Sequence, residues 1–174
     1  EEFSGMDVKI VANLPYYITT PIIMKILEER YNVSKIVVMV QKEVAQRLNS
    51  LPGSKEYGAI TLAVQYRADT NIAMIVPNSV FMPRPKVDSA VIEFNILKTP
   101  RIKVKDEKLL FNVIKASFGQ RRKTLLNGLS NNLKLPKDTV KVALTNAGID
   151  PVTRGETLGL NEFGRIADEL KQLI

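Results

Sequence analysis

The 174-residue sequence predicts half of an α/β sheet followed by a small, basic, all-helical domain. In the first part of the chain, β-branched apolar runs alternate with helical segments, as in sheets that helices cover. From Asp106 onward, apolar residues recur only at helical spacing. The net charge is +1 over residues 1–98 and +6 over residues 99–174. We therefore expect domains at 1–98 and 99–174, the second attracting a polyanion, with nucleic acid the first candidate.

The first strand and helix are expected within residues 8–30. VKIVA, residues 8–12, is a short apolar run of the kind that forms a buried strand. Thr20 is a suitable N-cap and Pro21 stands where helices accept proline, at the first position, so a helix is expected from Pro21 to about residue 30. KIVVMVQ, residues 35–41, is a β-branched run typical of a strand covered on both faces.

The next elements are helix, loop, helix and strand, at residues 42–49, 52–58, 59–67 and 71–76. Residues 89–97 alternate apolar and polar side chains, which predicts a further strand. Before it lies VFMPRPKVD, residues 80–88, whose two prolines exclude a helix and favour an extended segment. Four helices are expected beyond Asp106, at residues 109–118, 123–131, 137–146 and 161–173.

Composition excludes several kinds of chemistry. The chain has no cysteine and no histidine, so disulfides, thiolate or imidazole metal sites, and catalysis by a cysteine or a histidine base are all impossible. We expect no metal centre. The longest apolar run, Ile36–Val40, is far shorter than the roughly 18 residues of a membrane helix. No signal peptide is evident in the first residues. The lack of cysteine suits a cytoplasmic protein, so we expect that location, and we expect no membrane partner.

The segment Asn13-Leu14-Pro15-Tyr16 directly follows the first predicted strand and suits the binding of an adenine amino group. Such a group is a poor nucleophile because its lone pair is conjugated into the ring. The side-chain carbonyl of Asn13 and the backbone carbonyl of Leu14, oriented by Pro15, can accept its two N–H bonds. Tyr16 offers a flat face for base stacking. Taken alone, the segment also fits a strand-to-helix turn that holds two core tyrosines.

Five segments together resemble the dimethyladenosine transferase (KsgA-type) family. They are, in family order, VANLPYYITTPIIMKIL, VMVQKEVAQRL, YGAITLAVQY, VFMPRPKVDSAVI and FGQRRKTLLNGL. The resemblance implies the C-terminal half of a Rossmann-like S-adenosylmethionine-dependent methyltransferase, followed by a helical domain. It also implies that methyl groups pass from S-adenosylmethionine to two adjacent adenosines near the 3′ end of small-subunit (16S) rRNA, giving N6,N6-dimethyladenosine. The partner would be the small, 30S-type ribosomal subunit.

The resemblance also implies roles for individual residues. Asn13 would bind the target amino group and border the methyl donor, while Tyr16 would stack on the adenine. Phe81, at the head of FMPRP, resembles a second aromatic residue that packs on the flipped base; a core phenylalanine at a strand end is the alternative. Tyr17 has no such match and is expected to be a packing residue. The basic triplet Arg121, Arg122 and Lys123 would contact RNA phosphates.

One departure from the family pattern is large. No G-x-G loop and no acidic ribose-binding residue precede the Asn13 segment, where the only glycine is Gly5. We therefore expect this chain alone to bind S-adenosylmethionine poorly and to be inactive, and its open sheet to promote self-association. Two other functions remain open at this point. One is an RNA-binding or ribosome-assembly module that needs no methylation, and the other is a methylase of large-subunit rRNA or DNA.

Overall fold

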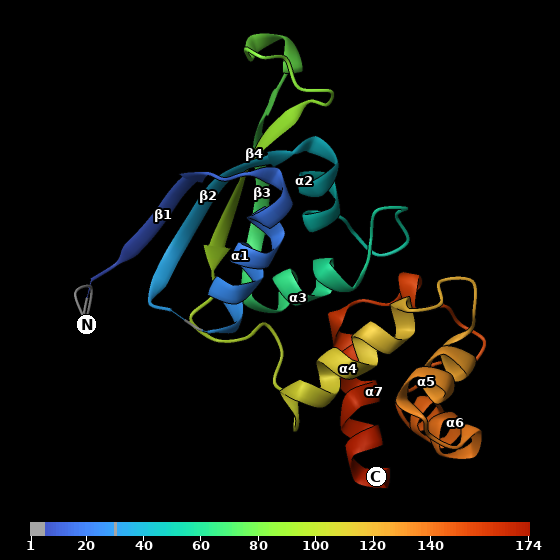
Figure 1. The fold of residues 1–174 in the computed structure, drawn as a ribbon. Helices are drawn as coiled ribbons and strands as arrows, with labels where there is room; N and C mark the ends of the chain where they lie inside the picture. Colours follow the sequence, from blue (N-terminus) through green and yellow to red (C-terminus); the bar gives the residue numbers. More distant parts are fainter. Residues whose placement is uncertain (1–5, 30) are drawn as a thin grey trace. The chain divides into compact units, whose positions relative to one another are not determined.

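The computed structural model describes residues 6–29 and 31–174 and divides into two compact units. The sheet unit extends to Ser50 and includes Ala63–Arg101, and the helical unit comprises Leu51–Leu62 and Ile102–Ile174. The strands are β1 (Val8–Asn13), β2 (Val33–Gln41), β3 (Ala68–Val76) and β4 (Ser89–Ile96) (Figure 1). The longer helices are α1 (Tyr16–Glu28), α2 (Lys42–Leu48), α3 (Ala59–Arg67), α4 (Glu107–Phe118), α5 (Leu125–Leu133), α6 (Lys137–Asn146) and α7 (Leu160–Leu173). Short 3-10 turns lie at η1 (Asn78–Val80) and η2 (Gly155–Thr157).

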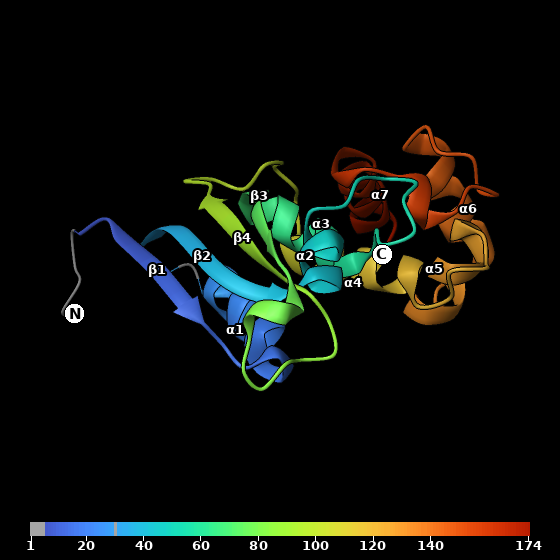
Figure 2. The same cartoon turned by 90° about the horizontal axis from the view of Figure 1, so that it is seen from above.

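The four strands form one mixed sheet in the order β1-β2-β4-β3. β1 and β2 are parallel, whereas β4 is antiparallel to both of its neighbours. In this register Gln41, Ser89 and Val76 lie side by side, and Asn13 pairs with Met39 near the same end of the sheet. Consequently the loop after β1 and the loop between β3 and β4 both leave the sheet at that end. Figure 2 shows the β3–β4 loop passing beside the start of α1.

One face of the sheet is covered and the other is open. Ile36 of β2 and Phe94 of β4 are fully buried on the face against which α1 and α2 lie (Figure 1). On the opposite face Val11 is 79% exposed, and Lys35 pairs with Glu93 at 3.3 Å. The described residues of this unit place no helix there. The predicted α/β half-sheet is therefore confirmed, with one covered face instead of two.

The first helix begins earlier than the sequence indicated. Helix α1 starts at Tyr16, not at Pro21, so Pro21 lies inside it. Pro15 takes the N-cap position, where its carbonyl accepts hydrogen bonds from the Ile18 N–H at 3.1 Å and the Thr19 hydroxyl at 2.9 Å. Inside the helix, Pro21 lacks the N–H that would donate to the carbonyl of Tyr17, a residue that is itself exposed. The prediction of Thr20 as N-cap was therefore wrong.

The helical unit includes a segment that the sequence placed in the first domain. Tyr57 is fully buried there, its hydroxyl donates to the Leu158 carbonyl at 2.9 Å, and its ring meets Phe118 edge-on at 5.9 Å between centroids. The backbone N–H of Gly53 also donates to the Glu156 carbonyl at 2.8 Å. These contacts explain why residues 51–62 belong to the helical unit, which otherwise begins at Ile102 instead of the expected residue 99.

Helices α4, α5, α6 and α7 supply the rest of this unit. Their apolar faces meet in a core that includes Leu110, Leu129, Leu144 and Phe163, all fully buried. This arrangement confirms the helical periodicity that the sequence shows beyond Asp106. None of the helices in the described part of the chain is long and apolar enough to cross a membrane.

Candidate functional site

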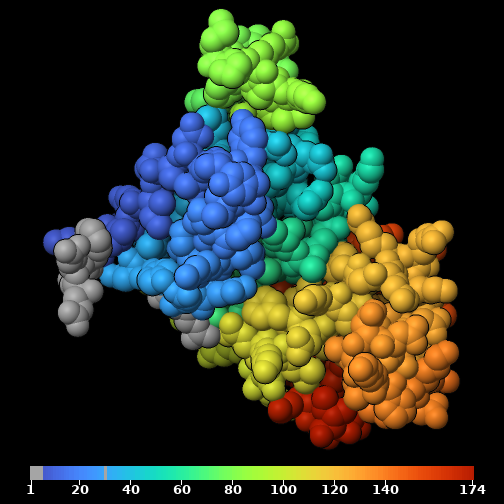
Figure 3. Space-filling model, viewed as in Figure 1, coloured from blue at the N-terminus to red at the C-terminus, as the bar shows by residue number. Residues whose placement is uncertain are grey.

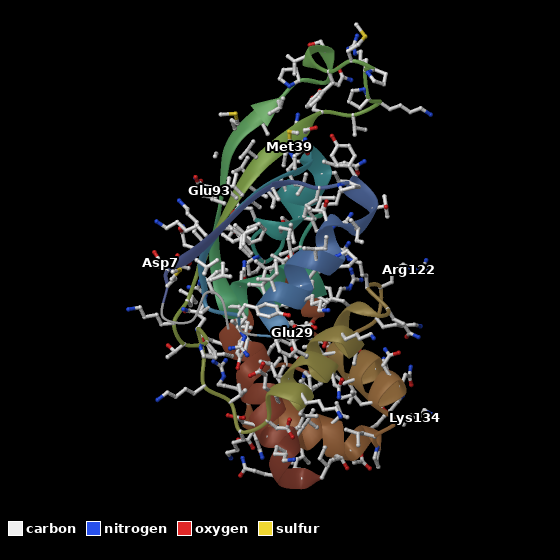
Figure 4. All side chains as sticks on the ribbon, turned by 60° about the vertical axis from the view of Figure 1, so that its left-hand side comes forward. Asp7, Glu29, Met39, Glu93, Arg122 and Lys134 are labelled. Carbon is white, nitrogen blue, oxygen red and sulfur yellow. The ribbon has the colours of Figure 1, made fainter. Side chains whose placement is uncertain are left out.

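A hollow of about 390 Å³ lies at the end of the sheet where β1 and β2 finish. The nine residues that line it come from the β1–α1 connection, from β2 and from the β3–β4 loop: Asn13, Leu14, Pro15, Tyr16, Met39, Phe81, Met82, Pro83 and Pro85. These nine include all five residues that the sequence analysis assigned to binding of the target adenine: Asn13, Leu14, Pro15, Tyr16 and Phe81. In Figure 3 the surface of the β3–β4 loop rises beyond that of β1 and α1, and Figure 4 shows Met39 just below this loop.

Asn13 and Leu14 reach the hollow because β1 ends there. Asn13 is the last residue of β1, its side chain is exposed, and its neighbour in the register is Met39 of β2. Leu14 precedes Pro15, which is held at φ −56° and ψ 133°. Among the residues that the structure describes, no hydrogen bond engages the Asn13 amide or the Leu14 carbonyl. Both oxygens can therefore accept N–H groups of a ligand.

Tyr16 is held by a hydrogen bond that the sequence does not indicate. Its hydroxyl lies 2.7 Å from the Oγ of Ser89, the first residue of β4. Ser89 is fully buried, whereas Tyr16 is half-buried at the edge of the hollow. The two residues are 73 positions apart, so only the sheet topology brings them together.

Tyr17 is not the packing residue that the sequence suggested, because it is 85% exposed. Successive residues of a helix point about 100° apart, so Tyr16 and Tyr17 at the start of α1 cannot face the same surroundings. Only Tyr16 lines the hollow.

Hydrogen bonds within the β3–β4 loop, which carries Phe81, and an ion pair to α2 stabilise this loop. The Asp88 carboxylate accepts the backbone N–H of Asn78 at 3.1 Å and pairs with the Lys42 Nζ at 3.8 Å. The guanidinium of Arg84 donates from Nε and Nη2 to the Asn78 Oδ1 at 2.9 and 2.7 Å. Phe81, which is half-buried, follows η1 within this loop and is thereby kept beside the hollow.

The basic triplet lies in the turn between α4 and α5 of the helical unit, and its members have different surroundings. The Nη2 of Arg121 donates to the carbonyls of Lys55 and Tyr57 at 2.9 and 3.1 Å, and its Nε lies 3.8 Å from the Glu156 carboxylate. Arg122 and Lys123 are exposed, and neither side chain makes an ion pair or a hydrogen bond within the described residues. Figure 4 shows Arg122 pointing away from the unit.

The sheet and the hollow together define a class of protein. Ligands of open α/β sheets bind beyond the carboxyl ends of parallel strands, which is where Asn13 lies. With its helical part, the chain has the fold of the C-terminal half of a Rossmann-like methyltransferase. It belongs to the ribosomal RNA adenine dimethylase family, whose family model matches residues 3–172.

Curated relatives agree with this assignment. A ribosomal RNA small subunit methyltransferase A from Alkaliphilus oremlandii is 52% identical over 171 residues, which are 98% of this chain and 60% of that protein. A protein of the same name from Clostridioides difficile is 51% identical over 168 residues, 97% of this chain and 58% of that protein. The chain thus spans about 60% of the length of the curated relatives that it matches.

Solved structures support the fold. A dimethyladenosine transferase from Plasmodium falciparum matches with a TM-score of 0.80 and 25% identity, over 98% of this chain and 69% of that one. The 23S rRNA methyltransferase ErmE matches with a TM-score of 0.66 and 21% identity, over 95% of this chain and 66% of that one. The second likeness concerns the fold alone.

Proposed function

We propose that this chain is the base-binding and RNA-binding part of an rRNA adenine N6,N6-dimethyltransferase. The whole protein would transfer methyl groups from S-adenosylmethionine to two adjacent adenosines near the 3′ end of small-subunit rRNA. The observation that carries the proposal is the convergence of Asn13, Leu14, Tyr16 and Phe81 on one hollow, although Phe81 lies some 65 residues from the others. Family membership and the names of the curated relatives support the same activity.

The chemistry follows from the acceptors at the hollow. The Asn13 side-chain carbonyl and the Leu14 backbone carbonyl accept the two N–H bonds of the adenine amino group, which draws the nitrogen out of conjugation and orients its lone pair. Tyr16 and Phe81 hold the extruded ring by stacking, worth about 1–3 kcal/mol per base. Rate enhancement then comes mainly from positioning the nitrogen for attack.

S-adenosylmethionine, when bound, supplies the electrophilic methyl group. The residues present fit one border of its site, because the exposed Asn13 amide stands at the carboxyl end of a parallel strand. No G-x-G pattern of the kind that cradles such a cofactor occurs among residues 1–12. We therefore propose that this chain alone binds the cofactor poorly and does not turn over, while the whole protein does both.

The RNA partner is the small ribosomal subunit, and the exposed Arg122 and Lys123 are proposed to contact its phosphates. The charge of +6 over residues 99–174 supports attraction of a polyanion in general. A cytoplasmic location follows from this substrate.

Self-association of this chain is a further part of the proposal. Within the described residues β1 pairs with β2 only, and the adjoining face exposes 79% of Val11. An unpaired strand edge favours pairing with a second copy. Light scattering at increasing concentration tests this: growth in mass supports association, and a constant monomer mass opposes it.

The activity is tested with the full-length protein, S-adenosylmethionine and small subunits that lack the modification. We expect N6,N6-dimethyladenosine at two adjacent positions of the rRNA, as measured by nucleoside mass spectrometry, and none with this chain alone. Tight binding of the subunit without any methyl transfer would contradict the proposal. That result would favour a ribosome-assembly module, a function for which the exposed Arg122 and Lys123 could also contact RNA.

A further inference from the structure

We propose that Ser89 is a positioning residue for methyl transfer, because it fixes the ring of Tyr16 as a stacking platform. The inference rests on the proposed function and deepens it. Ser89 does not line the hollow and touches no substrate in this account. It acts through the 2.7 Å hydrogen bond between its Oγ and the Tyr16 hydroxyl.

Ser89 is suited to anchoring because it cannot move easily. It is fully buried, and it is the first residue of β4, paired with Gln41 of β2 on one side and with Val76 of β3 on the other. Tyr16, by contrast, is the first residue of α1 and is only half-buried. A helix terminus frays more readily than the interior of a sheet. The hydrogen bond therefore ties a half-buried side chain at a helix terminus to a buried side chain of the sheet.

The bond also defines which part of Tyr16 serves the substrate. The hydroxyl of a tyrosine lies on the Cβ–Cγ axis, so a bond at this atom fixes the swing of the side chain about Cα–Cβ, and with it the place of the ring, and leaves only rotation of the ring about its own axis. Because this hydroxyl is engaged by Ser89, the ring face, and not the oxygen, is left for the adenine. A ring that is held before the base arrives loses less conformational entropy on stacking.

A different role for the tyrosine oxygen predicts a different result. If the hydroxyl acted directly on the substrate, removing it would be much more harmful than removing Ser89. If it serves only as the point of attachment, Tyr16→Phe and Ser89→Ala remove the same bond and cause the same defect. The two variants are then strongly non-additive, as expected of residues that act as one unit.

The experiment is a double-mutant cycle in the full-length protein on undermethylated small subunits. We expect Ser89→Ala and Tyr16→Phe each to lower kcat by about fivefold to tenfold, the worth of one hydrogen bond. The double variant should fall no further than either single one. KM should change little, because phosphate contacts elsewhere dominate RNA affinity.

Two control variants remove a hydroxyl and leave the Tyr16–Ser89 hydrogen bond intact. Tyr17→Phe alters the neighbouring exposed tyrosine, and Ser34→Ala alters a β2 serine whose Oγ bonds only weakly, at 3.4 Å, to the Val8 carbonyl. Both should keep wild-type kcat. Thermal unfolding of every variant separates a loss of positioning from a loss of folding, since the proposal requires the kcat defect in protein that remains folded at the assay temperature.

Several outcomes would overturn the inference. Wild-type kcat in Ser89→Ala, or defects that multiply in the double variant, would mean that the bond does not position the ring. A defect in Tyr16→Phe that far exceeds the one in Ser89→Ala would assign the oxygen to the substrate instead. Failure of the wild-type protein to methylate would overturn the proposed function itself, and is thus distinguishable from failure of the Ser89 role alone.

Discussion

Replacing Arg121 by alanine is expected to destabilise the helical unit, whereas replacing its neighbour Arg122 is expected to weaken RNA binding. The two arginines are adjacent in the same turn, but among residues 6–29 and 31–174 only the side chain of Arg121 has partners. Its guanidinium donates to the carbonyls of Lys55 and Tyr57 and lies near the Glu156 carboxylate. It therefore joins the turn to the 51–62 segment and to η2.

The magnitude of each effect follows from these contacts. A hydrogen bond from a charged donor contributes about 1.5–3 kcal/mol when it is well shielded from water. The Arg121 side chain is 48% exposed, so solvent screening reduces the total for its two bonds to about 1–2 kcal/mol. For Arg122, loss of a single phosphate contact should reduce the slope of log K against log salt by about 0.7–0.9.

Two assays on the same variants distinguish these effects. Urea unfolding gives the free energy of unfolding, and rRNA affinity measured across a salt series gives the slope. We expect Arg121→Ala to lose stability with nearly the wild-type slope, and Arg122→Ala to show the reverse. A stable Arg121→Ala variant with a reduced slope would overturn this prediction, since it would mean that Arg121 contacts phosphate instead of the backbone carbonyls.

Three further predictions concern the base site and the helical unit. Phe81→Ala should lower kcat/KM of the full-length protein roughly fivefold to 150-fold, which corresponds to the loss of about 1–3 kcal/mol of stacking. Val80 is an exposed neighbour outside the hollow, and Val80→Ala should leave kcat/KM unchanged. Burial raises the pKa of Tyr57 above its usual 10.0. The contribution of the neutral Tyr57 to stability is therefore complete below pH 10.0 and is lost as the pH rises further. Tyr57→Phe should lower the free energy of unfolding in urea by about 1 kcal/mol and remove this alkaline dependence. The hydrogen bond from Lys171 lowers the pKa of Asp106 from 3.8, so unfolding of the helical unit should become easier as the pH falls below 3.8, an effect that Asp106→Asn should abolish. An alkaline unfolding profile unchanged in Tyr57→Phe, or an acid profile unchanged in Asp106→Asn, would contradict the respective assignment.

Local signals in the sequence were sufficient for the segment that carries Asn13. An apolar run predicts the strand, and the polar residue that ends it must lie at the carboxyl end of that strand. The resemblance to the family added Phe81, whose place beside the hollow depends on the sheet order β1-β2-β4-β3. No periodicity specifies that order, because β4 follows β3 in sequence and yet separates it from β2.

Contacts between distant residues account for what the sequence did not predict. The hydrogen bond of Tyr16 to Ser89 spans 73 positions, and that of Tyr57 to Leu158 spans 101. Neither leaves a pattern in its own neighbourhood. The start of α1 differs from the prediction for another reason. Pro21 fits the first position of a helix, but it lies inside α1, where the carbonyl left without its N–H partner is that of the exposed Tyr17.

We propose that the Asn13 side chain orients the amino group of the target adenine. The most direct measurement compares Asn13→Ala with wild type in the full-length protein, for affinity to undermethylated small subunits and for methyl transfer to them. Asn71→Ala, which changes an exposed asparagine of β3 away from the hollow, is the matched control. We expect Asn13→Ala to bind the subunit nearly as well as wild type and to transfer no measurable methyl groups. Retained turnover in Asn13→Ala would mean that other residues orient the amino group, and would remove this role from Asn13.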